Sequence, residues 1–363
     1  MAVDWNHTPL KEKDDGIIRI DSYEALLAFA SWVNCGAAGA RAVLTAEITA
    51  EDREWTPIGA DRDCPFSGRF DGRGHSIIGL SNEAADAPEA GGLFGCVIGG
   101  SVWNVEVRDG RIRGKVAGGV AAVNEGEVVN CSFIGDVAGV AAAGGIAGCL
   151  GKNGVLGNCR FRGVVKDESA AGGFVGHSLG TVRGCRGSGD VTGVLAAGGV
   201  AGRVLKEGTV EDCSFLGSVA GGESCAGGVV GDNHGRVAVC DFFGKVTAKF
   251  AGGVAGDNSG ELAGCKGADL VKGFAAGGVV GSNTSKGTVR ACRFSGSVEG
   301  ENAGGAVAGD NSGSLKDCEG SGSVTGWIEE GEGVWRIVGC DLGGSVTGCR
   351  FTAVPYGGGA PEN

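Results

Sequence analysis

The feature that most constrains this chain is a repeat of 25 to 28 residues, marked in each unit by one cysteine and a following glycine pair. A period of this length is typical of solenoids, in which each unit packs mainly against its neighbours. Valine or leucine stands three residues before each cysteine, and valine stands six residues after it. Such columns indicate that equivalent residues stack. The cysteines are Cys131, Cys159, Cys185, Cys213, Cys240, Cys265, Cys292 and Cys318, and a shorter last unit is predicted at Cys340.

Within each unit, apolar and polar residues alternate around the cysteine, as they do in a strand with one buried face. A second apolar column follows the glycine pair, and no segment after residue 60 has a helical period. The sequence therefore predicts an all-β chain folded as a parallel β-helix of about eleven coils, roughly 50 Å long, with about three short strands per coil. The recurring "GDNSG" segments are predicted to turn corners by placing asparagine and glycine at positive φ.

Three segments are predicted along the chain. Residues 1–60 form an N-terminal cap and entry strand, with a short amphipathic helix at about 22–33 that Asp21 or Ser22 caps. This helix would close the open end of the solenoid. Residues 61–354 form the β-helix, and residues 355–363, "PYGGGAPEN", form a flexible tail.

The column of phenylalanines that follows the cysteines is interrupted in three units. Two residues after the cysteine, phenylalanine is replaced by glycine at Gly187, Gly267 and Gly320. An unfilled hole of that size would cost about 3 to 5 kcal/mol. In those three units the residue nine positions after the cysteine is apolar, which predicts that Val194, Phe274 and Trp327 turn inward to fill the space.

Charge and cysteine content narrow the possible partners. The formal charge of −12 disfavours nucleic acid and anionic lipid, and no segment is apolar enough for membrane insertion. No cofactor motif is found. Fifteen cysteines, spaced singly, indicate buried thiols that pack as small apolar groups. The N-terminus "MAVDWNHTPLKEKDDG" has no apolar signal segment, and a column of reduced thiols suits a cytoplasm or the surface of an anaerobe better than an oxidising compartment.

The first candidate binding site is the recurring Asp-Asn pair. Stacked carboxylates repel one another unless they are protonated, spread apart or bridged by a cation, so calcium is a possible ligand at Asp232 and Asp257. The alternative is structural: asparagine sets the bend while aspartate points to water. His177 and His234 lie at the same corners and are predicted to be solvated. The pairs are Asp232-Asn233, Asp257-Asn258 and Asp310-Asn311.

The second candidate is a polar cluster of Asp212, Asp241 and Lys266 on the outward face beside the cysteines. The column one residue after the cysteine alternates in sign in its later members, as cross-strand pairs that neutralise each other do. A polysaccharide lyase or glycoside hydrolase would need carboxylates gathered on such a face. No catalytic residue is assigned.

Several segments together resemble bacterial proteins with GLUG-motif repeats. They are "WTPIG" at Trp55, "FDGRGHSIIGL" at Phe70, "GGLFG" at Gly91 and "VWNVEV" at Val102, followed by "GGVAGDNSG" units. The resemblance implies a right-handed parallel β-helix of the pectin-lyase-like superfold, in secreted or surface-attached proteins that include adhesins and stalks beside protease domains.

These observations together predict a non-enzymatic rigid scaffold that binds a glycan or a protein through one lateral face. Two alternatives remain: a β-helical polysaccharide lyase or hydrolase, and a detached repeat module of a larger secreted protein.

Overall fold

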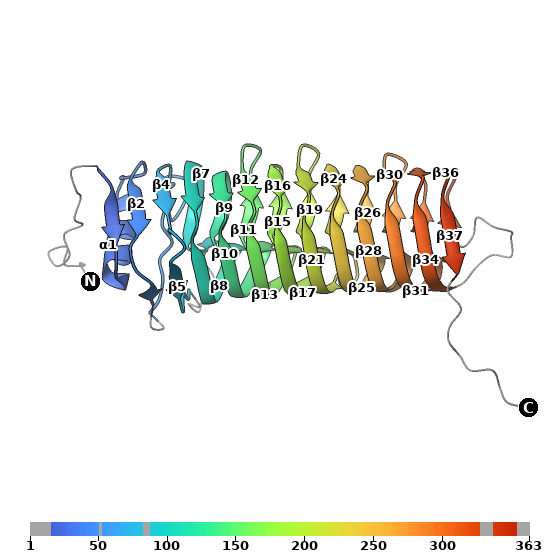
Figure 1. Ribbon diagram of the computed structural model, residues 1–363, viewed down its shortest axis with the longest axis horizontal. Coiled ribbons are helices and arrows are strands. Elements are labelled where there is room, and N and C mark those ends of the chain that lie inside the picture. The colour runs from blue at the N-terminus through green and yellow to red at the C-terminus, as the bar shows by residue number, and fades with distance from the viewer. Residues whose placement is uncertain (1–15, 51–52, 83–87, 327–336, 354–363) are drawn as a thin grey trace, which may run out of the picture.

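The computed structural model describes residues 16–50, 53–82, 88–326 and 337–353. The chain is a parallel β-solenoid of about 12 turns with one short helix near the N-terminus, so the predicted fold class is confirmed with one more coil than expected. Figure 1 shows the coils stacked along one axis from α1 at one end to β37 at the other. No helix among the described residues is long and apolar enough to cross a membrane.

Two parallel sheets run along this axis. The first contains β1 (Ile18–Ile20), β2 (Arg41–Leu44), β4 (Arg69–Asp71), β7 (Phe94–Trp103), β9 (Ala121–Val129), β11 (Ala147–Leu150), β12 (Val155–Gly157), β15 (Val175–Ser178), β16 (Thr181–Arg183), β19 (Ala201–Val204), β20 (Thr209–Glu211), β23 (Val230–Asn233), β24 (Arg236–Ala238), β26 (Ala255–Asn258), β27 (Glu261–Ala263), β29 (Val280–Asn283), β30 (Thr288–Arg290), β32 (Ala308–Asn311), β33 (Ser314–Lys316), β35 (Val338–Asp341) and β36 (Ser345–Thr347).

The second sheet contains β3 (Ile48–Thr49), β5 (Ser76–Ile78), β6 (Ala90–Gly91), β8 (Glu106–Gly118), β10 (Ser132–Gly144), β13 (Arg160–Asp167), β14 (Ala170–Gly172), β17 (Arg186–Gly193), β18 (Ala196–Gly198), β21 (Ser214–Ala220), β22 (Cys225–Gly227), β25 (Asp241–Gly252), β28 (Lys266–Gly277), β31 (Arg293–Gly305), β34 (Glu319–Thr325) and β37 (Arg350–Ala353). A typical coil is β25, β26 and β27. Its three strands confirm the predicted unit.

The N-terminal helix α1 spans Tyr23–Asn34, one residue later than predicted, and Ser22 is its N-cap. The Ser22 hydroxyl accepts a hydrogen bond from the Ala25 backbone N–H at 3.3 Å. Leu26, Phe29 and Val33 are fully buried. The Phe29 ring packs against the Phe66 ring of the first coils, so the helix covers the end of the core as the sequence predicts.

The core is built from continuous files of equivalent residues. The eight aligned cysteines are all buried, and the valine or leucine three residues before each one pairs in parallel register with its counterparts. The Cys213 thiol, for example, donates to the Glu211 carbonyl at 3.2 Å. Buried thiols that bond backbone carbonyls confirm the structural interpretation of the cysteine column.

The positive-φ corner lies one residue before the cysteine rather than in the "GDNSG" segments. Asn233, Asn258 and Asn311 are absent from the residues with positive φ, so that part of the prediction was wrong. The asparagines turn the chain through their side chains: the Asn233 Oδ1 accepts the Gly235 N–H at 3.1 Å. At the corner before the cysteine, φ is 50° to 67° in Asn130, Asn158, Gly184, Asp212, Val239, Gly264, Ala291, Asp317 and Gly348, and Asn104, which precedes Val105, has φ of 54°.

The predicted exchange of core volume is also wrong. Val194 is 50% exposed and Phe274 is 45% exposed, so neither side chain fills the space beside its glycine, and Trp327 lies outside the described residues. The phenylalanine of the next coil fills the gap instead. A Cβ added at Gly278 would lie 2.5 Å from the Phe294 ring, and one added at Gly253, one coil further back, would lie 2.9 Å from it. One ring therefore spans two coils.

The last coil is aligned differently from the prediction. Cys340 pairs in register with Asp310, so it does not continue the cysteine file. Cys349 does: Arg350 pairs with Glu319, Phe351 pairs with Gly320, and the Cys349 thiol accepts the Cys318 N–H at 3.4 Å. The final unit is therefore the Cys-Arg-Phe segment that begins at Cys349.

Candidate functional site

The predicted aspartates lie in one column of the first sheet. Register pairs place His177, Arg203, Asp232, Asp257, Ser282 and Asp310 on successive coils, and we call this set the aspartate column. Strands β22 and β26 are in contact across the bend between the sheets, and this packing leaves the aspartate column half-buried. Asp232 is 15% exposed at its side chain.

Asp232, the first aspartate of the column, has two close side-chain partners. The Arg203 Nε donates to Asp232 Oδ2 at 2.8 Å, and the His234 Nε2 lies 2.9 Å from Asp232 Oδ1. Within the described residues, no three histidine, cysteine or acidic side chains are grouped to hold a metal ion. The counter-charge at the predicted calcium position is thus supplied by Arg203, and the His234 ring lies beside the same carboxylate.

The second and third aspartates are less well compensated. Burial raises the pKa of the Asp257 carboxyl, and the negative charge of Asp232 on the preceding coil raises it further. Burial also raises the pKa of Asp310. The Oδ1 atom of Asp257 is buried and has no hydrogen-bond partner among the residues that the structure describes. The unfavourable environment of the charged form follows directly from low solvent access and a like charge nearby.

The neighbouring asparagines form a buried ladder. Each Nδ2 donates to the Oδ1 of the next coil: Asn233 to Asn258 at 2.8 Å, Asn258 to Asn283 at 2.9 Å, and Asn283 to Asn311 at 2.9 Å. All are at most 1% exposed. The structure therefore assigns these amides to the fold rather than to an open surface, because a ligand could reach them only by opening the coil.

The histidine prediction needs correction at one position. His177 is half-buried, its Nε2 has no hydrogen-bond partner in the described part of the chain, and burial lowers its pKa, so it is not the solvated corner residue that we expected. His234 is largely exposed but is paired with Asp232.

The second predicted cluster does not form a single group. Asp212 pairs with Arg186 at 2.9 Å between Oδ1 and Nη2, whereas Asp241 lies 3.8 Å from Lys266 Nζ on the next coil. Both pairs are exposed. The predicted alternation of sign along this column is not strict, because Lys266 and Arg293 are register neighbours of the same sign. The predicted pairing of opposite charges is found, since Arg293 Nε lies 3.1 Å from Glu319 Oε2.

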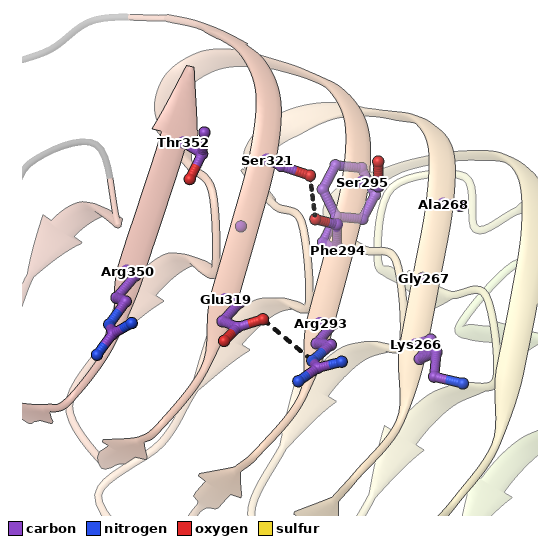
Figure 2. Close-up of a pocket in the computed structure, with 11 residues that line it drawn as sticks. Lys266, Gly267, Ala268, Arg293, Phe294, Ser295, Glu319, Ser321, Arg350 and Thr352 are labelled. Atoms are coloured by element: carbon purple, nitrogen blue, oxygen red, sulfur yellow. Dashed lines mark hydrogen bonds and ion pairs between the residues drawn. The ribbon is translucent and has the colours of Figure 1, made fainter. Parts of the chain in front are cut away.

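The C-terminal part of the same column lines a hollow of about 500 Å³ on the outer face of β28, β31, β34 and β37. Lys266, Arg293, Glu319 and Arg350 follow one another in register, and we call them the arginine column. Figure 2 shows them side by side on successive strands, with a second row of Ser295, Ser321 and Thr352 two residues further along each strand. We call this region the C-terminal hollow.

Sequence analysis found only part of this hollow. Lys266 was assigned to a cluster with Asp212 and Asp241, and Arg350 was missed because the last unit was placed at Cys340. The signal was present: Cys349-Arg350-Phe351 repeats the Cys-charged-Phe pattern of Cys292-Arg293-Phe294. Aligning on this triplet places Arg350 in the same outward column.

Comparison with known proteins gives two similarities. Residues 272–299 match the sequence profile of the GLUG motif. A crystal structure named "putative immunoglobulin A1 protease" from Bacteroides ovatus is similar in fold, with a TM-score of 0.45 and 22% identity, over 94% of this chain and 85% of that one. No curated protein matches the chain.

Proposed function

We propose that this GLUG-motif β-solenoid is a rigid scaffold that binds an extended ligand, a glycan or a protein segment, on one lateral face. The observation that supports the proposal is the C-terminal hollow, where charged side chains repeat in register on four neighbouring strands and hydroxyl side chains on three of them. Strands stacked at about 4.8 Å present such groups at a fixed interval, so a polymer with regular units meets the same chemistry several times.

The hollow offers little for hydrolysis. Glu319 is the one carboxylate among the described residues that line it, and Arg293 Nε lies 3.1 Å from its Oε2. Glycoside hydrolysis usually requires two carboxyl groups that flank the scissile bond. The arrangement therefore favours retention of a ligand over its cleavage.

The experiment fills the hollow and measures binding and turnover together. The double variant Ser295→Tyr/Ser321→Tyr places two rings in the hollow, and Thr192→Tyr/Ser218→Tyr places two rings elsewhere on the same sheet as a matched control. We expect arrays of glycans and proteins to show a ligand that the first variant loses and the control keeps, without reducing-end or unsaturated product. Product formation would favour the lyase or hydrolase alternative. Equal binding by both variants would show that the ligand binds to another face.

A further inference from the structure

The charges of the C-terminal hollow identify a class of ligand. The described residues that line it include three cations and one anion, which together carry a charge of +2 in a chain whose formal charge is −12. Arg350 has no ion pair among the described residues, and Lys266 reaches Asp241 only at 3.8 Å. A cationic site in an anionic molecule attracts small or sparsely charged anions to one place while the rest of the surface repels them.

The second row of side chains adds hydroxyl chemistry. Ser295, Ser321 and Thr352 lie on successive strands on the same outward face as the arginine column. The Ser321 hydroxyl donates to the Phe294 carbonyl at 3.3 Å, which leaves its oxygen lone pairs available as acceptors. A ligand that fits both rows carries anionic groups on one edge and hydroxyl groups on the other.

The described residues that line the hollow provide no aromatic platform at its surface. Phe294 is the one aromatic residue among them, and it is 3% exposed because its ring is part of the core. Stacking of bases on aromatic rings, on which proteins that bind single-stranded nucleic acids rely, is therefore absent from this hollow. An uncharged sugar would also find no apolar ring to cover, so the affinity must come from charge and hydrogen bonds.

We infer that the C-terminal hollow binds an acidic glycan, with carboxylate or sulfate groups held by Lys266, Arg293 and Arg350 and ring hydroxyls held by Ser295, Ser321 and Thr352. This inference rests on the proposed scaffold function. The cations stand on the first, second and fourth of four strands spaced by about 4.8 Å, a distance comparable to the length of one pyranose unit. Glu319 on the third strand limits the affinity, since it occupies Arg293 and repels an acidic ligand.

The first test removes the cations. Polygalacturonate provides a carboxylated probe, dextran sulfate a sulfated one and dextran an uncharged one, each measured by biolayer interferometry at low and high salt. For Lys266→Gln/Arg293→Gln/Arg350→Gln we expect the affinity for at least one acidic glycan to fall about tenfold or more. The matched variant Arg183→Gln/Lys206→Gln/Lys286→Gln removes three exposed charges elsewhere and should bind as the wild type does.

The second test works by gain of binding, so that misfolding cannot imitate the result. Glu319→Gln should raise the affinity for the acidic probe about threefold, and Glu207→Gln, which removes an exposed carboxylate paired with Lys152, should not. Salt should weaken binding of the acidic probes and leave dextran unaffected.

The outcomes separate the inference from the scaffold function. Loss of acidic-glycan binding in the triple variant, with gain in Glu319→Gln, supports the inference. Equal binding of dextran, or a triple variant that binds as well as the wild type, overturns it while the scaffold function stands. Binding of RNA or an acidic peptide in place of glycans also overturns it. A wild-type chain that retains no polymer of any class overturns both.

Discussion

The aspartate column of the first sheet and the arginine column of the second are both formed by in-register stacking of equivalent residues, but they differ in solvent exposure. Each is a run of charged residues on successive coils, in register, with at least one ion pair near 3 Å. The aspartate column lies beside the strands that pack across the bend, whereas the arginine column faces open solvent. The comparison shows that burial, and not the sequence pattern, separates a structural column of charges from one that is free to bind a ligand.

The largest difference is expected when one cation is removed from each column. Arg203→Met leaves Asp232 half-buried with only His234 beside it, and we expect a loss of about 2 to 4 kcal/mol of unfolding free energy. Arg293→Met breaks an exposed pair and should cost less than about 0.5 kcal/mol. Urea denaturation of both variants checks this, and equal losses would show that the two columns do not differ in burial.

The reactivity of thiols tests the same difference between buried and exposed groups at the N-terminal end of the aspartate column. Cys149 pairs in register with His177, and burial raises the pKa of its thiol from 9.0 to about 11. Since only the thiolate reacts, the thiolate fraction at pH 8 is about 100-fold below that of an ordinary thiol. Iodoacetamide followed by peptide mapping should label the exposed Cys35 first and Cys149 far more slowly. The eight core thiols should react only on unfolding, and fast labelling of Cys149 would mean that the column opens to solvent.

The smallest effect concerns pH. The pKa of Asp257 is higher in the folded than in the unfolded chain. At pH values between these two pKa values the folded state therefore binds more protons than the unfolded state. Its contribution is therefore most favourable below the ordinary value of 3.8 and is lost as pH rises through the folded pKa. Asp257→Asn removes the charge and should raise the melting temperature at pH 7 by about 1 to 3 °C, with the gain fading towards pH 4.

Calorimetry across this range measures the effect, with the exposed Asp241→Asn as the control. A gain that is the same at pH 4 and pH 7 would show that Asp257 is not penalised by its burial. Loss of stability in Asp257→Asn at both values would point instead to a favourable contact of the carboxylate.

The fold could be predicted because it depends on short-range regularities that the sequence repeats. Val, Leu and Cys at constant spacing predict files of buried residues, and those files are present in register. The prediction for Phe274 failed for a different reason. It assumed that each coil fills its own core, whereas Phe294 lies over the glycines of the two preceding coils. The spacing of residues along the chain does not reveal how far an aromatic side chain extends along the solenoid axis into neighbouring coils.

The candidate site was predictable only in part, because the charged residues are visible in the sequence but their depth is not. Asp232, Asp257 and Asp310 were found as a column, while the burial that changes the pKa of Asp257 and Asp310 was not. Arg350 was missed through a choice of alignment at the last coil. The asparagines that follow the aspartates were predicted either to belong to a binding site or to set the bend, and they are core residues whose amides bond to one another.

The sequence by itself determined that equivalent residues stack, because a period of 25 to 28 residues with fixed apolar positions sets the register of the coils from Cys131 to Cys318. Only the tertiary structure decided which outward column is covered and which is open. The physical reason is that register is set by neighbouring coils, which the repeat encodes. The solvent exposure of each column depends on how the two sheets pack against each other across the bend. That packing involves residues from every part of the coil.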